Sequence, residues 1–273
     1  MSKEGAMTIR FIAITIAGAV AATGIGSARA DEPVADLAAE PTETVVARSA
    51  ADGQYLPLTL APSVGAVGAV AAGYGGYDAA REAAVMVSYA DVRVWGPLAI
   101  RGVAELSDTA HRLRPSIGAR LQLLSQARHG IDGAVAVMYR AEGFNEPEGE
   151  IETVLSVGRR FGRTMLLGNV AYGQDPEARE RDGELRAAVL VGVGKRGDIQ
   201  VGLDARWRFD LGSEAAKLMA SREPTYDLAA GPVAALPLGP VALIAQAGVS
   251  AIRRVGENAR VGAVALGGVG ASF

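Results

Sequence analysis

The segment Ile199–Phe209 alternates strictly between apolar and polar side chains, and this alternation constrains the fold more than any other feature. One phase is wholly apolar, and the other phase consists of Gln200, Gly202, Asp204, Arg206 and Arg208. Successive side chains of a strand point to opposite faces, whereas a helix would scatter these residues around its circumference. The segment therefore predicts a strand, and its length is that of a tilted strand that crosses a membrane, about 9–11 residues.

Segments of the same kind recur from about residue 64 to the end of the chain. We predict twelve strands, near 64–75, 82–95, 98–106, 115–127, 132–142, 150–161, 163–173, 184–195, 198–210, 225–237, 240–252 and 261–273. The second is irregular, because its apolar phase changes between Tyr89 and Val92. A β-bulge near Ala90 is expected to restore the alternation.

The connections between these segments alternate in length. The short connections lie at 96–97, 128–130, 161–162, 196–197 and 238–240. The longer, charged connections lie at 76–81, 107–114, 143–149, 174–183, 211–224 and 253–260. This pattern predicts an antiparallel barrel with short turns on one rim and long loops on the other. We also expect a short helix over 213–220, outside the barrel.

Aromatic side chains fall near both predicted rims, where amphipathic rings meet the two interfaces of a bilayer. At the short-turn rim we place Trp95, Phe161 and Phe273. At the long-loop rim we place Tyr74, Tyr172, Trp207, Phe209 and Tyr226.

The N-terminus has the features of an export signal. Lys3 and Arg10 precede the uncharged apolar stretch 11–25, and Ala28-Arg29-Ala30 fits a small-x-small cleavage site. A cleaved signal peptide over 1–30 is favoured over a short membrane anchor. Residues 31–60 are rich in acids, Ala, Pro and Thr, which predicts a disordered periplasmic segment. That segment could instead enter a lumen as a plug, and the sequence leaves both alternatives open.

Together these features make the chain resemble the bacterial outer-membrane β-barrel proteins. The terminal Phe273, with Val269 and Ala271 at alternate positions before it, is similar to the signal that the barrel-assembly machinery reads. The resemblance implies an all-β fold over 61–273, a closed antiparallel up-and-down transmembrane β-barrel of about twelve strands, in contact with outer-membrane lipid. Two other folds compete, namely a transmembrane helix over 228–252 and a soluble β-sandwich.

Other kinds of chemistry have little support in the sequence. The chain has no cysteine, and its 27 basic and 30 acidic residues give no nucleic-acid footprint. Residues 192–197 match G-x-G-x-x-G, but a strand rather than a helix is expected to follow. His111 with Asp108 and Ser107 is the one conceivable catalytic group, and His129 lies at the opposite rim. We expect no enzyme activity, no cofactor and no metal site.

The best functional lead is a set of charged residues on the predicted inner phase. The set consists of Arg101, Glu105, Arg120, Arg140, Glu142, Glu152, Arg160, Arg186, Asp204, Arg206 and Arg208. Because arginines outnumber acids seven to four in this set, an open pore would prefer anions. The sequence therefore predicts a narrow passive channel for small, possibly anionic solutes. The alternative is a non-conducting structural or surface-interaction barrel whose interior is closed by salt bridges.

Overall fold

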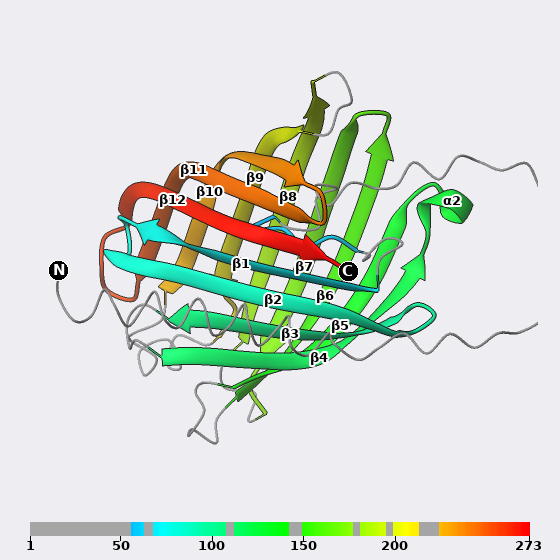
Figure 1. The fold of residues 1–273 in the computed structure, drawn as a ribbon. Helices are drawn as coiled ribbons and strands as arrows, with labels where there is room; N and C mark the ends of the chain where they lie inside the picture. Colours follow the sequence, from blue (N-terminus) through cyan, green and yellow to red (C-terminus); the bar gives the residue numbers. More distant parts are fainter. Residues whose placement is uncertain are drawn as a thin grey trace, which may run out of the picture. The chain divides into compact units, whose positions relative to one another are not determined.

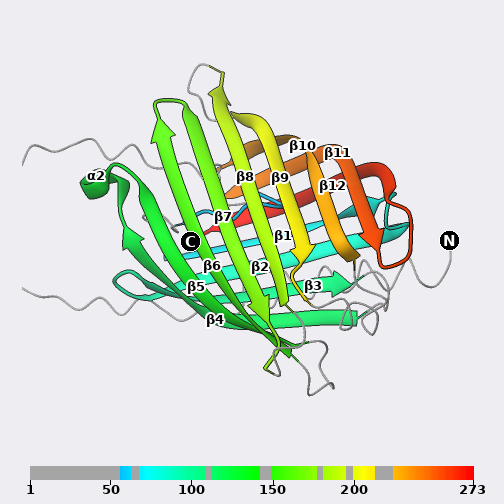
Figure 2. The ribbon, with the colours of Figure 1, turned by 180° about the vertical axis from the view of Figure 1, so that it is seen from behind.

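The described part of the chain is a closed barrel. A computed structural model describes residues 56–62, 68–107, 112–141, 149–176, 181–194, 199–212 and 224–273. In these residues each strand pairs antiparallel with its sequence neighbours, and β1 pairs with β12 to close the wall (Figures 1 and 2). The predicted all-β, up-and-down barrel of twelve strands is confirmed, and a two-sheet sandwich is wrong.

The strands agree with the predicted segments to within a few residues. They are β1 (Ala69–Asp78), β2 (Ala83–Trp95), β3 (Leu98–Ser107), β4 (Arg112–Leu124), β5 (Asp132–Ala141), β6 (Gly149–Phe161), β7 (Thr164–Gln174), β8 (Arg181–Val193), β9 (Ile199–Asp210), β10 (Pro224–Leu238), β11 (Val241–Arg254) and β12 (Arg260–Ser272).

The two rims differ as predicted. The turn rim carries tight connections such as 96–97, 162–163 and 239–240. Both ends of the barrel also meet at this rim, where the Gly68 amide donates to the Phe273 carbonyl at 2.8 Å. The loop rim carries the opposite connections, although the first of them is only a four-residue turn at 79–82. The helix expected at 213–220 lies outside the described residues.

One short helix of the turn rim was not predicted. It is α2 (Gln126–His129), between β4 and β5. The helix ends where Gly130 takes a left-handed conformation with φ of 74° and donates its N–H to the Gln126 carbonyl. Among the described residues no helix is long and apolar enough to cross a membrane. Residues 228–252 instead form the β10–β11 hairpin, so the helical alternative is wrong.

Alternation of the two faces holds along the wall. On β9, Leu203 has 57% of its surface exposed on the outside, whereas the neighbouring Asp204 is fully buried inside. Strands β4, β5, β6 and β8 follow the predicted phases in the same way. The outer surface of the barrel is consequently apolar over most of its height.

The expected bulge near Ala90 is wrong. The β1–β2 register runs without interruption through the Ala71–Ala90 pair, and the irregularity of β2 lies against β3, between Arg93 and Trp95. Tyr89 is buried inside the barrel, so the apolar residues of the first half of β2 face inward. The interior therefore contains an apolar region, which the alternation of apolar and polar residues did not predict.

Most of the predicted interface aromatics lie on the outer face. Trp95, Phe161, Tyr172, Trp207 and Phe273 are exposed there. The Trp207 ring also lies near those of Phe209 and Tyr226, at 5.0 and 6.2 Å between centroids.

Tyr74 is the exception to this placement. Its side chain is 4% exposed and lies inside the barrel, 6.3 Å from the ring of Tyr89 between centroids. It belongs to the inner apolar region, and its assignment to an interface is wrong.

Candidate functional site

The interior near the loop rim is crossed by a network of ion pairs, which we call the loop-rim layer. It consists of Asp78, Arg81, Glu105, Arg140, Glu150, Glu152, Asp182, Glu184, Arg186, Arg206, Arg208 and Asp227. Arg206 Nη2 lies 2.9 Å from Asp227 Oδ2, and Arg208 Nη2 lies 3.2 Å from Glu184 Oε2.

The loop-rim layer spans the lumen and is not confined to one side of the wall. Arg81, in the turn after β1, pairs with Asp227 on β10, three strand positions away around the barrel. Glu105 on β3 interacts electrostatically with Arg208 on β9, which is the opposite wall. Long arginine side chains from several strands therefore converge on the middle of this level.

A second group of charges lies nearer the turn rim, on three adjacent strands. The Arg101 guanidinium donates two hydrogen bonds to the Asp91 carboxylate, from Nε to Oδ1 at 2.9 Å and from Nη2 to Oδ2 at 2.5 Å. Arg120 Nε lies 3.7 Å from the same carboxylate. A bidentate arginine–carboxylate pair of this kind is the strongest and most directional ion pair available to side chains.

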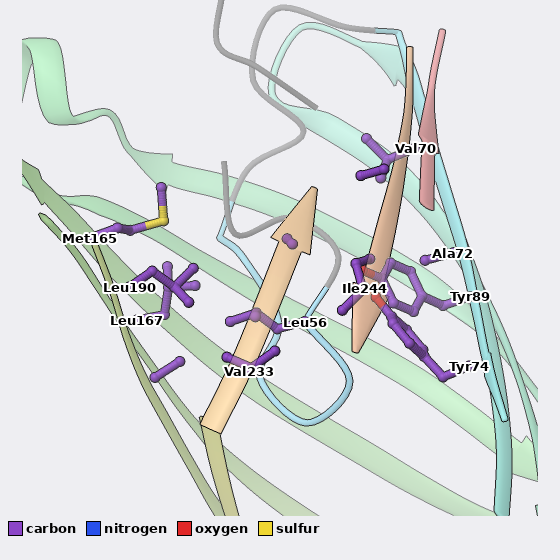
Figure 3. Close-up of a cluster of buried hydrophobic side chains, with 13 residues drawn as sticks. Leu56, Val70, Ala72, Tyr74, Tyr89, Met165, Leu167, Leu190, Val233 and Ile244 are labelled. Atoms are coloured by element: carbon purple, nitrogen blue, oxygen red, sulfur yellow. The ribbon is translucent and has the colours of Figure 1, made fainter. Parts of the chain in front are cut away.

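Residues 56–62 lie between and beside these groups and are not part of the wall. We call them the inner segment. Leu56 is 2% exposed and belongs to a cluster of inward-facing residues from β1, β2, β7, β8, β10 and β11. Figure 3 shows Leu56 in the middle of this cluster, with Leu167 and Leu190 on one side and Tyr74 and Tyr89 on the other.

The backbone of the inner segment is held by side chains of the wall. The Leu58 N–H donates to Asp204 Oδ2 at 2.9 Å, and the Thr59 hydroxyl donates to Asp204 Oδ1 at 2.6 Å. The Leu60 N–H donates to Asn169 Oδ1, and Asn169 Nδ2 donates back to the Leu60 carbonyl, both at 2.8 Å.

A third wall residue completes these contacts, because Arg120 Nη1 donates to the Pro62 carbonyl at 2.6 Å. The wall backbone is committed to its own ladder, so only side chains are free to satisfy a chain inside the barrel. Asn169 uses its amide as a neighbouring strand would use a peptide group, with one donor and one acceptor.

The local sequence suits this position. Pro57 and Pro62 lack an N–H, so they bring no donor into the lumen, and they keep Leu56 and Ala61 extended. On the wall, Gly158 leaves room for the segment, because a Cβ there would lie 3.1 Å from Pro62 Cγ.

Opposing free-energy terms of similar size act on the inner segment. Burying each of its three leucines contributes about 1.5–3 kcal/mol, and ordering each residue opposes this by about 1–2 kcal/mol. The hydrogen bonds to wall side chains add about 1 kcal/mol each, or more where the acceptor is charged. The favourable and unfavourable terms are of similar size, so the net free energy that holds the segment is small compared with either.

A small cavity separates the inner segment from the loop-rim layer. Its volume is about 30 Å³, and its lining includes Pro57, Leu58, Asp78, Arg81 and Arg206. Because about 10–15 Å³ is needed for one water molecule, this space can hold about two. This cavity is therefore too small for a solute much larger than water.

The structure gathers most of the predicted lumen residues into these groups. Glu105, Arg140, Glu152, Arg186, Arg206 and Arg208 belong to the loop-rim layer. Arg101 and Arg120 pair with Asp91, and Asp204 binds the inner segment. Arg160 stands apart at the turn rim, where its backbone pairs with the side chain of Gln126, and Glu142 lies outside the described residues.

Six acidic residues of the interior were missed. They are Asp78, Asp91, Glu150, Asp182, Glu184 and Asp227. Two of them lie two positions from a predicted residue on the same strand, Glu150 from Glu152 and Glu184 from Arg186, so strict application of the alternation could have found these two. The Leu-x-Leu-x-Leu pattern of residues 56–60 was the overlooked signal for the inner segment.

The other candidate groups gain no support. His129 is exposed in α2, with Nδ1 3.2 Å from the Ser125 nitrogen. His111 and Asp108 lie outside the described residues, as do the signal peptide and residues 195–197 of the glycine motif. Within the described ranges, no three His, Asp or Glu side chains gather in a way that could hold a metal ion.

Comparison with solved structures finds bacterial outer-membrane barrels. A NanC porin is 11% identical over 74% of this chain and 98% of its own, with a TM-score of 0.50. The outer membrane channel DcaP of Acinetobacter baumannii is 8% identical over 70% of this chain and 63% of its own, with a TM-score of 0.45. An anion-selective porin from Comamonas acidovorans is 11% identical over 68% and 59%, with a TM-score of 0.39.

These identities are low enough that the likeness shows the fold alone. No protein-family model matches the chain, and no curated protein does. At the level of the fold, the predicted resemblance to outer-membrane porin barrels is confirmed.

Proposed function

We propose that the chain is an outer-membrane barrel that forms a narrow passive channel for small solutes. One observation carries this proposal: the wall encloses enough space to hold the inner segment, an extended stretch of polypeptide that is not part of the wall. In barrels of about eight strands the side chains of the wall fill the interior completely. A twelve-strand wall that admits a peptide backbone leaves, without it, a bore of the width that a small solute needs.

The apolar outer face supports a location in the outer membrane. Leu203 lies near mid-height of β9, and Leu211 lies just beyond the loop-rim end of that strand; both are exposed. An arginine at the bilayer midplane of a barrel destabilises it by about 2–4 kcal/mol, against about 0–1 kcal/mol near the interfaces. Leu203→Arg should therefore weaken refolding into lipid vesicles much more than Leu211→Arg, and equal effects would exclude a lipid-facing wall.

Conduction is tested directly with the full-length chain. In planar bilayers we expect small single-channel currents that are interrupted by closures, and in liposome swelling we expect uptake of small solutes only. A displaced inner segment should raise the current, because that segment lies inside the lumen from mid-height towards the turn rim. Leu58→Glu is the variant to use, since it places a charge in an apolar cluster.

Charge selectivity is the finer part of the proposal. The sequence favoured anions, yet six further carboxylates pair with the arginines of the interior. We therefore expect any preference for anions to be weak, since the fixed charges of the bore nearly cancel. Reversal potentials in asymmetric salt measure it, and a marked preference for cations would overturn the anionic version.

A second candidate function is a non-conducting barrel with a salt-bridged interior. The loop-rim layer favours it, because an ion pair there links Arg81, in the turn after β1, to Asp227 on β10, and Glu105 on β3 interacts electrostatically with Arg208 on the opposite wall. If the full-length chain and Leu58→Glu both fold and neither conducts, the ion pairs alone close the barrel and this second function holds.

A further inference from the structure

The inner segment contacts the wall in the manner of a bound peptide. Its contacts at Leu58, Thr59, Leu60 and Pro62 fall on consecutive or nearly consecutive residues, and each uses a side chain of the wall. A strand of the wall would instead pair through its backbone with a neighbour. The arrangement is that of a receptor site with a peptide ligand in it.

The receptor site has both a polar and an apolar part. Asp204 accepts two hydrogen bonds, and Asn169 gives and accepts one each. The apolar part takes Leu56 into one cluster and Leu58 into a second, which is formed with Ala229, Val264 and Leu266. Both parts belong to the wall, so the site persists when its occupant leaves.

We propose that Asp204, Asn169 and Arg120, together with these two apolar clusters, form a site for an extended peptide of the pattern Leu-Pro-Leu-Thr-Leu-Ala-Pro. The chain's own residues 56–62 occupy this site and exchange with it reversibly. Release of the segment vacates the space that it occupies in the lumen, from mid-height towards the turn rim. Binding itself is independent of the proposed function; only the effect of release on current rests on that function.

The first experiment measures binding in trans. A fluorescein-labelled synthetic peptide of residues 56–62 is titrated against full-length Leu58→Glu barrel in detergent, and anisotropy is recorded. We expect saturable binding to this variant and binding at least about tenfold weaker to the wild-type barrel, whose tethered segment competes at a high effective concentration. A peptide that carries the Leu58→Glu change should not bind.

The wall side of the site is tested in the same titration. Adding Asn169→Ala to the Leu58→Glu barrel should weaken peptide binding by roughly tenfold, since two hydrogen bonds are lost. Ser250→Ala is the matched control, because Ser250 is buried on the inner wall and bonds to Asp78, not to the segment. A folded Leu58→Glu barrel that fails to bind the wild-type peptide overturns the inference.

A second experiment leaves the leucines of the segment in place and replaces only the Thr59 hydroxyl, one of the two donors to Asp204, with a thiol. The chain has no cysteine, so Thr59→Cys places one thiol at a fully buried position of the segment. A membrane-impermeant maleimide should label it slowly and to completion, and an excess of free peptide should speed the labelling by capturing the vacated site. Asn258→Cys, at an exposed loop position, should react at once. Complete protection of residue 59 would show that the segment is a fixed part of the barrel.

The two proposals fail in different ways. If the peptide binds Leu58→Glu but that barrel carries no current, the channel function is wrong and the peptide site stands. If Leu58→Glu conducts and the peptide neither binds nor blocks, the site is wrong and the channel stands.

Discussion

The two halves of the lumen are occupied by different groups. Near the loop rim, charged side chains of the wall, such as Arg206 and Asp227, extend into the lumen and pair there. From mid-height towards the turn rim, the lumen holds the inner segment, which contributes no strand to the wall. The first group belongs to the wall and its pairs help to stabilise the barrel. The second, on the proposal above, leaves while the wall stays intact.

The physical reason is that the two sets of groups respond differently when they lose their binding partners. A buried charge that loses its partner is strongly destabilising, so the ions of the loop-rim layer hold one another in place. The inner segment leaves behind Asp204, Asn169 and Arg120, which water can solvate in an emptied lumen. Four substitutions test this contrast.

The largest effect is expected from Asp227→Ala. It removes the carboxylate that both Arg81 and Arg206 use, and breaking a buried pair in this way destabilises a protein by about 3–5 kcal/mol. The urea midpoint, followed by the fluorescence of Trp95 and Trp207, should fall markedly. An unchanged midpoint would mean that the loop-rim layer does not support the barrel.

The next effect is expected from Asp204→Ala, and it falls on the inner segment. Loss of the acceptor for the Leu58 N–H and the Thr59 hydroxyl should weaken the hold on the segment by about 2–3 kcal/mol. Limited proteolysis of folded barrel should cut near residues 56–62 roughly 30–100-fold faster. The urea midpoint of the wall should move little, and a fall comparable to that of Asp227→Ala would erase the contrast between the two halves.

A smaller effect is expected from Gly158→Ala. The added methyl would lie 3.1 Å from Pro62 Cγ and 2.9 Å from the flexible side chain of Leu167, an overpacking that we expect to weaken the segment's hold by about 1 kcal/mol. Gly168→Ala is the control, because its nearest neighbour would be an ordinary 3.6 Å away. Proteolysis should quicken a fewfold in the first variant only, and identical rates in both would contradict the contact with Pro62.

The smallest effect is expected from Arg260→Ala. Arg260 pairs with Glu82 outside the buried layer, and their side chains are 38% and 67% exposed. Such surface pairs contribute about 0–1 kcal/mol. The urea midpoint should stay close to that of the wild type, and a loss as large as that of Asp227→Ala would show that burial does not set the strength of these pairs.

The wall could be predicted from the sequence to a large extent because its signal is local. Leu203 and Asp204 are neighbours with opposite polarity, and that contrast alone assigns each to a face. On β2 the same signal led to the wrong prediction of a bulge near Ala90, because Tyr89 faces inward although it is apolar. Alternation tells which residues share a face, but it does not tell what lies against that face.

The interior could be predicted only in part. Arg206 and Arg208 were assigned correctly to the lumen, whereas their partners Asp227 and Glu184 were not recognised. Ion pairing depends on which strands become neighbours and on how far long side chains reach across the lumen. Neither can be predicted from the sequence of a single segment. Tyr74 was placed at an interface for the same reason, since its inward neighbours come from other strands.

The sequence by itself determined the number of strands, their two faces and the unlike rims, because a strand's period of two and the residue preferences of turns act over a few residues. Only the tertiary structure decided that Leu58 meets Asp204, a contact between residues 146 positions apart, and that an apolar patch lies inside a charged lumen. Contacts of that range exist only after the wall has closed, when the inner faces of all the strands surround the same space.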